Sequence, residues 1–233
     1  MRQENGKPVR ISRAGILAGA RSIWPIALFA VPFGVAFGAA ALETGVERET
    51  AMAMSALVFA GAAQFAALEF WVQPIDLVAL LLVVFAVNAR HILMGAALYP
   101  WMRQLPWGRR HAAAALISDA NWAYAMEAHE KGERDLGILV GSGALMWLCW
   151  GLGTTAGAVL GEAIAEPRRF GLDAVMVTFF ACVLAAMARR EVVLWPWLAA
   201  AVAALAATWV LPTGWHVLTG GLVGGLVGAL GRD

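Results

Sequence analysis

The chain has 233 residues, of which 61% are hydrophobic and only 14% charged, and its mean hydropathy is +0.71. A soluble domain carries about 25% charged residues, so the composition excludes an ordinary soluble protein and indicates one that lies in a membrane. Seventeen Lys and Arg nearly balance sixteen Asp and Glu, and without a basic stripe we expect no nucleic-acid partner.

The first 21 residues are polar and basic, and they show no cleavable signal peptide. Their positive charges are Arg2, Lys7, Arg10, Arg13 and Arg21. Because positive charges stay on the cytoplasmic side of a membrane, residues 1–21 are expected to form a cytoplasmic tail. The chain that follows is expected to pass several times through the inner (plasma) membrane.

Eight hydrophobic segments follow this tail, each close to the roughly 20 residues that a helix needs to cross a bilayer. In chain order they are 22–42, 51–72, 77–99, 112–128, 136–160, 170–188, 192–211 and the glycine-rich 214–231. None alternates apolar and polar residues as barrel strands do. We therefore expect an all-α fold, a polytopic transmembrane helix bundle of seven or eight hydrophobic segments that form one transmembrane domain at 22–231.

The basic loops leave two topologies open. If all eight segments cross, the arginines in 103–110 and 168–169 face the wrong side. If the second and sixth segments are re-entrant, these loops become cytoplasmic, and the halves 22–128 and 136–231 form an inverted repeat, as in many secondary transporters. The sequence FAGAAQFA in the second segment offers small residues for a helix break, whereas the sixth segment contains no glycine or proline.

Three polar side chains interrupt the third segment, at Asn88, Arg90 and His91. A charged arginine near the middle of a bilayer costs about 2.5–3.5 kcal/mol, so it needs a partner or a water-filled cavity. On a regular helix Asn88 and His91 share a face and Arg90 points away. Either the backbone unwinds near residue 89, or Arg90 serves another interface, or the segment ends there and Arg90 snorkels to the headgroups.

Two further groups lie in apolar surroundings. In AGAAQF, residues 60–65, Gly61 and Gln64 share a helical face and either bind a zwitterionic substrate or join two helices. Asp119, in the fourth segment, is either a proton relay or a structural partner of Arg90 or His91. The sequence contains no P-loop, metal-ligand cluster or nucleophile elbow, so we expect no enzyme, no metal site and no cofactor.

The sequences VFAGAAQFAAL at 58–68 and NARHILMGAALYPWM at 88–102 strongly resemble the AzlC-type branched-chain amino acid permease family. The resemblance continues through SDANWA at 118–123, WGLGTTAGAVLG at 150–161 and GLDAVMVTFF at 171–180, and so covers nearly the whole chain. It implies the large subunit of a two-component exporter, paired with a small AzlD-type membrane subunit. Leucine, isoleucine and valine, with methionine as a further candidate, would be the substrates, and the proton gradient would drive transport.

Such a substrate needs an apolar pocket and partners for one carboxylate and one ammonium group. Arg90 or the amides around Gly61 are candidates for the carboxylate, and Asp119, Gln64 or Asn88 for the ammonium. The expected substrate-binding residues are Gly61, Gln64, Phe65, Asn88 and Arg90. His91 and Asp119 are expected to couple transport to protons, because histidine changes its charge near physiological pH. The alternative function is a structural or assembly subunit whose partner carries the translocation path.

Overall fold

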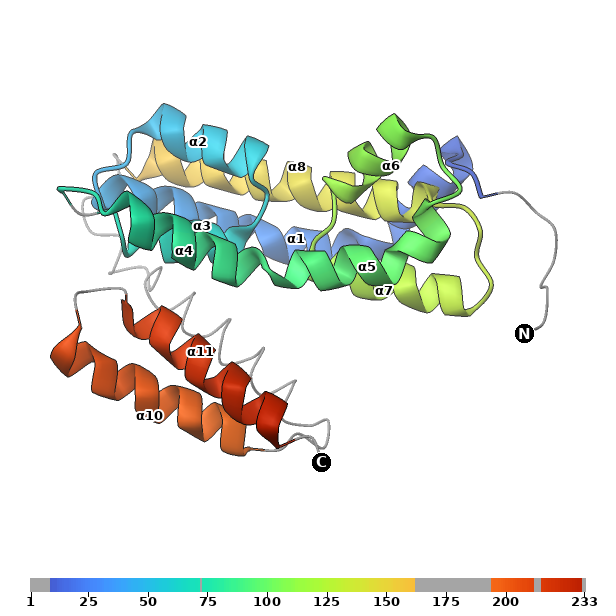
Figure 1. Cartoon of the computed structure of the whole chain (residues 1–233). Helices are drawn as coiled ribbons and strands as arrows, with labels where there is room; N and C mark the ends of the chain where they lie inside the picture. Colours follow the sequence, from blue (N-terminus) through green and yellow to red (C-terminus); the bar gives the residue numbers. More distant parts are fainter. Residues whose placement is uncertain (1–8, 72, 162–193, 212–214, 232–233) are drawn as a thin grey trace.

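The computed structural model describes residues 9–71, 73–161, 194–211 and 215–231. The predicted sixth segment, 170–188, lies outside the described residues. The described elements are helices (Figure 1), as expected for an all-α membrane protein. Three are long and apolar enough to cross a membrane: Arg13–Glu43, Leu77–Met102 and Gly137–Leu160. The expected total of seven or eight segments is not confirmed.

Two of these long helices form the central pair, α1 (Arg13–Glu43) and α8 (Gly137–Leu160). Gly19 of α1 lies against the backbone of Ile138, and Gly157 of α8 lies against the backbone of Val35. The N-terminal part of α1 therefore contacts the N-terminal part of α8, and the C-terminal parts of the two helices also contact each other. The two helices thus run parallel. Glycine permits this close approach, since it brings no side chain between the two backbones.

The second predicted segment is a broken helix. Its first part is α2 (Arg48–Leu57) and its second part is α3 (Gly61–Leu68), after which the chain continues into α4 (Figure 1). Between them Phe59 has a φ of 45°, a left-handed conformation that a helix does not continue. Leu68 at the end of α3 and Val46 before α2 belong to the same core cluster. The chain therefore returns to the end of the bundle from which it came, the geometry expected of a re-entrant segment.

The third long span consists of α4 (Leu77–Asn88) and α5 (Arg90–Met102), which meet at Ala89. The span continues to Met102, so Arg90 lies at its centre. A helix that continues for a further twelve residues past Arg90 favours the alternatives in which Arg90 lies inside the membrane over the one in which the segment ends there. Met102 packs in one core cluster with Leu136, just before α8, so this span runs antiparallel to α8 and to α1.

Two short helices replace the single helix expected at 112–128: α6 (Trp107–Ala114) and α7 (Asp119–Glu130). The chain breaks between them because Ser118 starts α7 with a capping box, in which its N–H donates to Asn121 Oδ1 at 2.6 Å. Near the other end of α7, His129 stacks on Trp101 of α5 with ring centroids 4.5 Å apart. The α6–α7 hairpin thus also returns to the end where it began.

The predicted halves 22–128 and 136–231 are not confirmed as an inverted repeat. Inverted halves with these bounds would make α1 and α8 antiparallel, whereas the two helices run parallel. Within 13–130, however, one pattern occurs twice: a long helix followed by a hairpin of two short ones (Figure 1). The two long elements are antiparallel, so the two hairpins enter the bundle from opposite ends.

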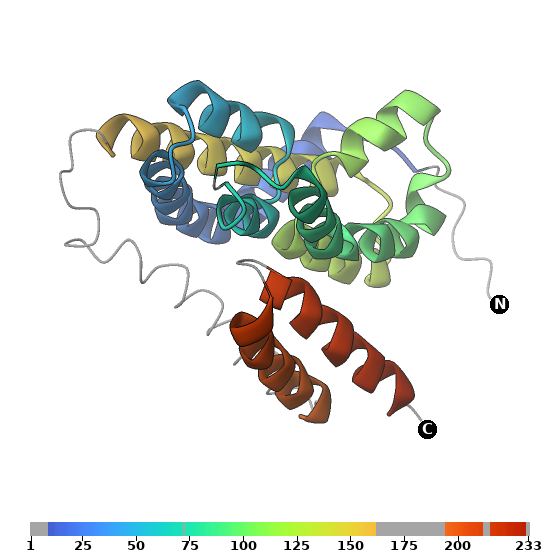
Figure 2. The same cartoon turned by 60° about the vertical axis from the view of Figure 1, so that its left-hand side comes forward.

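The last described elements, α10 (Trp195–Val210) and α11 (Trp215–Leu230), form an antiparallel hairpin beside the bundle (Figure 2). Gly220 and Gly224 of α11 lie against Ala204 and Ala200 of α10. The glycine-rich last segment thus packs against a helix of the same chain. Trp215 packs against the apolar cluster that includes the start of α4.

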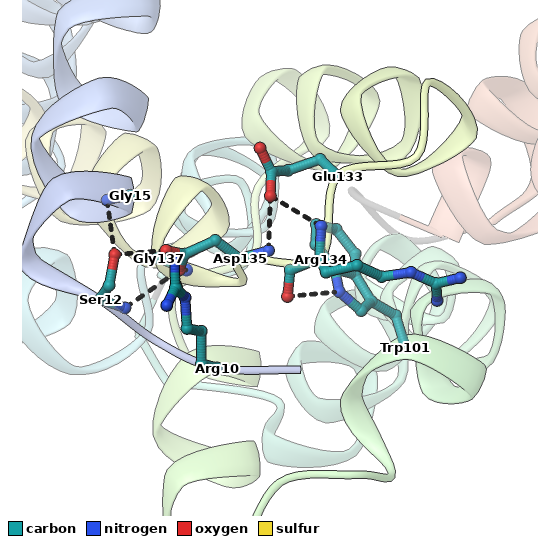
Figure 3. Close-up of polar contacts among 8 residues, drawn as sticks. All are labelled: Arg10, Ser12, Gly15, Trp101, Glu133, Arg134, Asp135 and Gly137. Carbon is teal, nitrogen blue, oxygen red and sulfur yellow. Dashed lines mark hydrogen bonds and ion pairs between the residues drawn. The ribbon is translucent and has the colours of Figure 1, made fainter. Parts of the chain in front are cut away.

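At the other end of the bundle, Asp135 joins the first turns of α1 and α8 (Figure 3). Its carboxylate accepts hydrogen bonds from the Ser12 N–H at 3.0 Å, from the Ser12 hydroxyl and from the Gly137 N–H at 2.8 Å. Arg10 Nε lies 3.7 Å from the same carboxylate. The N–H of Leu136 donates to the Arg10 carbonyl at 2.8 Å. We call Arg10, Ser12, Asp135 and Gly137 the N-terminal clamp.

We predict that Asp135→Asn destabilises the protein by about 2 kcal/mol at neutral pH, because it weakens several hydrogen bonds to one charged group. Burial alone would raise the pKa of Asp135, but the hydrogen bonds from Ser12 and Gly137 and the charge of Arg10 outweigh it, so the pKa lies below 3.8. This stabilisation is therefore complete above pH 3.8 and is lost as the pH falls through the folded-state pKa.

Thermal melts of the detergent-solubilised protein at a series of pH values check this prediction. The difference in Tm between wild type and variant should be large at neutral pH and should shrink in acid. Glu130→Gln, at an exposed carboxylate on the same end of the molecule, should melt like wild type. A Tm difference that does not change with pH would contradict the role assigned to the ionised Asp135.

Candidate functional site

Three helical segments are interrupted in the middle of the bundle, at 58–60, at Ala89 and at 115–118. Two of these breaks face the middle of α8. A Cβ added to Gly61 would lie 2.8 Å from the Trp150 ring, and one added to Gly143 would lie 2.3 Å from the Leu116 carbonyl oxygen. Residues 143 and 150 are about 10 Å apart along a helix. In transporters such broken helices bring polar groups and helix termini to the depth where substrates bind.

An ion pair joins two of these breaks. Arg90, the first residue of α5, places Nη2 3.1 Å from Oδ2 of Asp119, the first residue of α7. Asp119 also benefits from its place in the first turn of a helix, where the helix dipole favours negative charge. The two side chains remain 41% and 60% exposed. Of the two partners expected for Asp119, the structure places Arg90 beside it.

The break at Ala89 changes the hydrogen bonds of the backbone. The N–H of Ile92 donates to the Ala89 carbonyl at 3.1 Å, whereas a regular helix would use the Asn88 carbonyl. The Asn88 carbonyl instead lies 3.3 Å from His91 Nδ1. A carbonyl only accepts hydrogen bonds, so this contact requires the proton on Nδ1 and leaves Nε2 as the proton-accepting nitrogen of a neutral ring. The interruption near residue 89 is one of the alternatives expected from the sequence.

Two buried atoms at the same break have no hydrogen-bond partner among the residues that the structure describes. They are the side-chain oxygen Oδ1 of Asn88 and the guanidinium nitrogen Nε of Arg90. One is an acceptor and the other a donor. A buried polar group without a partner costs about 1–3 kcal/mol, so these atoms mark a place where a bound molecule would gain affinity.

Gln64 belongs to a second polar group, which joins the first hairpin to α8. Its Nε2 donates to Ser55 Oγ at 3.1 Å, and its Oε1 accepts from Trp150 Nε1 at 3.1 Å. Trp150 Nε1 also lies 3.0 Å from Ser55 Oγ, which lies 2.8 Å from Thr154 Oγ1. Because Ser55 Oγ accepts two hydrogen bonds, its own proton points to Thr154. Gln64 is 1% exposed, so its side chain makes these hydrogen bonds away from solvent.

Phe65 lies beside this network. Its ring makes edge contacts with Phe37 of α1 and Trp150 of α8, with centroids 5.4 and 6.5 Å apart. The predicted residues thus fall into two groups. Asn88, Arg90, His91 and Asp119 lie at the breaks of α4–α5 and α6–α7, whereas Gly61, Gln64 and Phe65 pack against α8 and its neighbours. Of the two interpretations of Gln64, this geometry favours the one in which it joins helices.

Asn121, for which the sequence predicts no substrate or proton role, has the corresponding place in the second hairpin. It is fully buried, and its Nδ2 donates to the Leu116 carbonyl at 2.8 Å and the Leu139 carbonyl of α8 at 3.3 Å. Each hairpin is therefore fixed to α8 by a buried carboxamide. The signal available in the sequence is the spacing of Ser118 and Asn121, which is that of a capping box.

Gln64→Ala is predicted to destabilise the protein by about 1–3 kcal/mol, because it removes two buried hydrogen bonds, while the apparent affinity for substrate in the folded fraction stays the same. Thermal melts and substrate titrations of the purified variant measure the two effects separately. Gln104→Ala, at an exposed glutamine, is the control and should change neither. Weaker substrate binding with an unchanged Tm would place Gln64 in the substrate site.

The profile of the AzlC protein family matches residues 25–164. This range covers more than half of the chain and includes both polar groups. The helical fold and its long apolar spans define a polytopic membrane protein, and the match shows that the chain belongs to the AzlC family.

The relatives are membrane proteins as well. An uncharacterized membrane protein of Archaeoglobus fulgidus is 29% identical over 145 residues, which is 62% of each chain. Uncharacterized membrane proteins from two strains of Helicobacter pylori are 24% and 23% identical over 147 residues, 63% of this chain and 64% of theirs. The matches thus span slightly less than two thirds of these relatives. No solved structure matches the chain.

Proposed function

We propose that this protein is a secondary transporter of branched-chain amino acids, working as an exporter driven by the proton gradient. It acts in the inner (plasma) membrane with its N-terminus in the cytoplasm and with a small AzlD-type subunit as its partner. The observation that carries the proposal is the Arg90–Asp119 ion pair between two half-helices at the centre of a membrane span. Membership of the AzlC family supports a transport-related role.

The same observation favours transport over the alternative, a structural or assembly subunit. Arg90 lies at the centre of the span Leu77–Met102, where insertion of an arginine costs about 2.5–3.5 kcal/mol. A subunit that only holds a partner in place gains nothing from this cost. A transporter gains charged groups at the depth where a polar substrate must leave water.

Flux of labelled leucine into inverted membrane vesicles tests the proposal. We expect uptake that needs this chain and a proton gradient and that increases when the small subunit is present. Isoleucine and valine should compete with leucine for uptake. Absence of leucine flux with both subunits present and a gradient imposed would overturn the proposal.

His91→Gln is predicted to abolish gradient-driven accumulation of leucine while exchange of labelled for unlabelled leucine continues. The reason is that His91 Nδ1 faces the Asn88 carbonyl, so Nε2 is the nitrogen available to take up a proton. Flux measured with and without an imposed pH gradient distinguishes the two activities. His111→Gln, at an exposed histidine, should retain both. Gradient-driven accumulation by His91→Gln at the wild-type rate would exclude His91 from proton coupling.

A further inference from the structure

The break between α4 and α5 holds one unused donor and one unused acceptor beside an ion pair. Arg90 Nε and Asn88 Oδ1 are buried and, within the described part of the chain, lack hydrogen-bond partners. The Arg90–Asp119 pair joins Nη2 to Oδ2 at 3.1 Å. An arginine has five N–H donors and a carboxylate has two acceptor oxygens, so most of the hydrogen-bonding capacity of the pair is unused.

These unused groups match one kind of molecule. A carboxylate accepts hydrogen bonds and would satisfy Arg90 Nε, and an ammonium group donates them and would satisfy Asn88 Oδ1. An α-amino acid in its zwitterionic form carries both of these groups on one carbon atom. The exposed parts of the pair, 41% of the Arg90 side chain and 60% of that of Asp119, leave room for such a molecule to approach.

We propose that an α-amino acid zwitterion binds by entering between Arg90 and Asp119. Its carboxylate pairs with the Arg90 guanidinium through Nε and a terminal nitrogen, and its ammonium group pairs with the Asp119 carboxylate and Asn88 Oδ1. The inference rests on the proposed transport function and deepens it, because it assigns each end of the substrate to a residue. It also assigns no substrate contact to Gln64, whose hydrogen bonds are already made within the protein.

This arrangement keeps the charges of the site balanced in both states of the transporter. Without substrate, Arg90 and Asp119 neutralise each other. With substrate, one ion pair is replaced by two, and the net charge stays zero because the zwitterion is neutral. Paired charges are the form in which ionised side chains are tolerated at membrane depth, so both the empty and the loaded protein meet this condition.

The test compares three ligands on the purified full chain in lipid nanodiscs: leucine, isoamylamine and isocaproate. Isoamylamine is leucine without its carboxylate, and isocaproate is leucine without its amino group. We expect wild type to bind leucine about 30-fold or more tightly than either analogue, because each analogue leaves one charge of the site unpaired at membrane depth.

Variants in which one of the two charges is removed should then change which of the three ligands binds most tightly. Arg90→Gln should bind leucine about 30-fold more weakly and should bind isoamylamine at least as well as leucine. Asp119→Asn should lose leucine affinity to a similar extent and should bind isocaproate at least as well as leucine. Arg103→Gln, at an exposed arginine at the end of the same span, should bind all three ligands as wild type does.

The outcomes separate this inference from the proposed function. Leucine affinity that is unchanged in both variants overturns the inference, and gradient-driven leucine flux would still support the transporter. Suppose that wild type binds another amino acid instead of leucine, and that the two single variants prefer the amine and the acid derived from that amino acid. This result supports the inference and overturns leucine as substrate. If the single variants misfold, Arg90→Gln combined with Asp119→Asn leaves no charge unpaired, and wild-type leucine affinity in that protein overturns the inference.

Discussion

Gly141→Ala is expected to prevent stable folding of the bundle. A Cβ at this position would lie 1.9 Å from the carbonyl oxygen of Ile16, far inside van der Waals contact. The obstacle is backbone and not the end of a flexible side chain, so α1 and α8 must separate. Overpacking of this kind costs about 3 kcal/mol or more, and the separation would also strain the close contacts at Gly19 and Gly157.

Expression level, monodispersity and Tm in detergent measure this effect. Gly151→Ala is a matched control, because it lies on the same helix and an added Cβ meets no atom within 4 Å. In a helix this control substitution is neutral or stabilising by up to about 1 kcal/mol. If Gly141→Ala melts as Gly151→Ala does, the parallel contact between α1 and α8 is not what holds the bundle together.

Replacing Arg90 alone with leucine is expected to destabilise the protein by about 2.5–3.5 kcal/mol, since it leaves the Asp119 carboxylate unpaired at membrane depth. Replacing Arg90 and Asp119 together with leucine removes both charges and should restore most of that stability. Transport should be lost in both proteins. The combination of restored stability and lost transport distinguishes a substrate site from a structural ion pair.

Thermal melts and leucine flux on wild type, on Arg90→Leu, on Asp119→Leu and on the double variant measure these two properties. The coupling between the two sites is the difference between the double variant and the sum of the single variants. A double variant that regains transport together with stability would show that the pair only supports the fold.

The positions of the membrane helices could be predicted from the sequence, because long apolar runs need no information about their neighbours. The helix break at 58–60 could also be predicted from the sequence, since the small residues around Gly61 permit it. The break before Asp119 was missed. Ser118 and Asn121 have the spacing of a capping box, but they lie in an otherwise apolar run that a helix can cross without interruption.

The sequence could not decide what Gln64 does, because its hydrogen-bond partners are distant in the chain. Ser55 is nine residues away and Trp150 is 86 residues away.

The parallel contact of α1 and α8 could not be predicted from the sequence for a related reason. Glycines spaced four apart, such as Gly137 and Gly141, show that one face of a helix carries small residues. They do not show which helix packs on that face or in which direction it runs. Pairing of Arg90 with Asp119 was foreseen as one of two alternatives, because an arginine inside a membrane needs a partner.

The most direct test of a substrate site at Arg90 and Asp119 is leucine uptake into inverted vesicles that contain equal amounts of wild type or of the double leucine variant. We predict gradient-driven uptake by wild type and none above background by the variant, with both proteins folded. Equal uptake by the two proteins would contradict the assignment of this ion pair to the transport path.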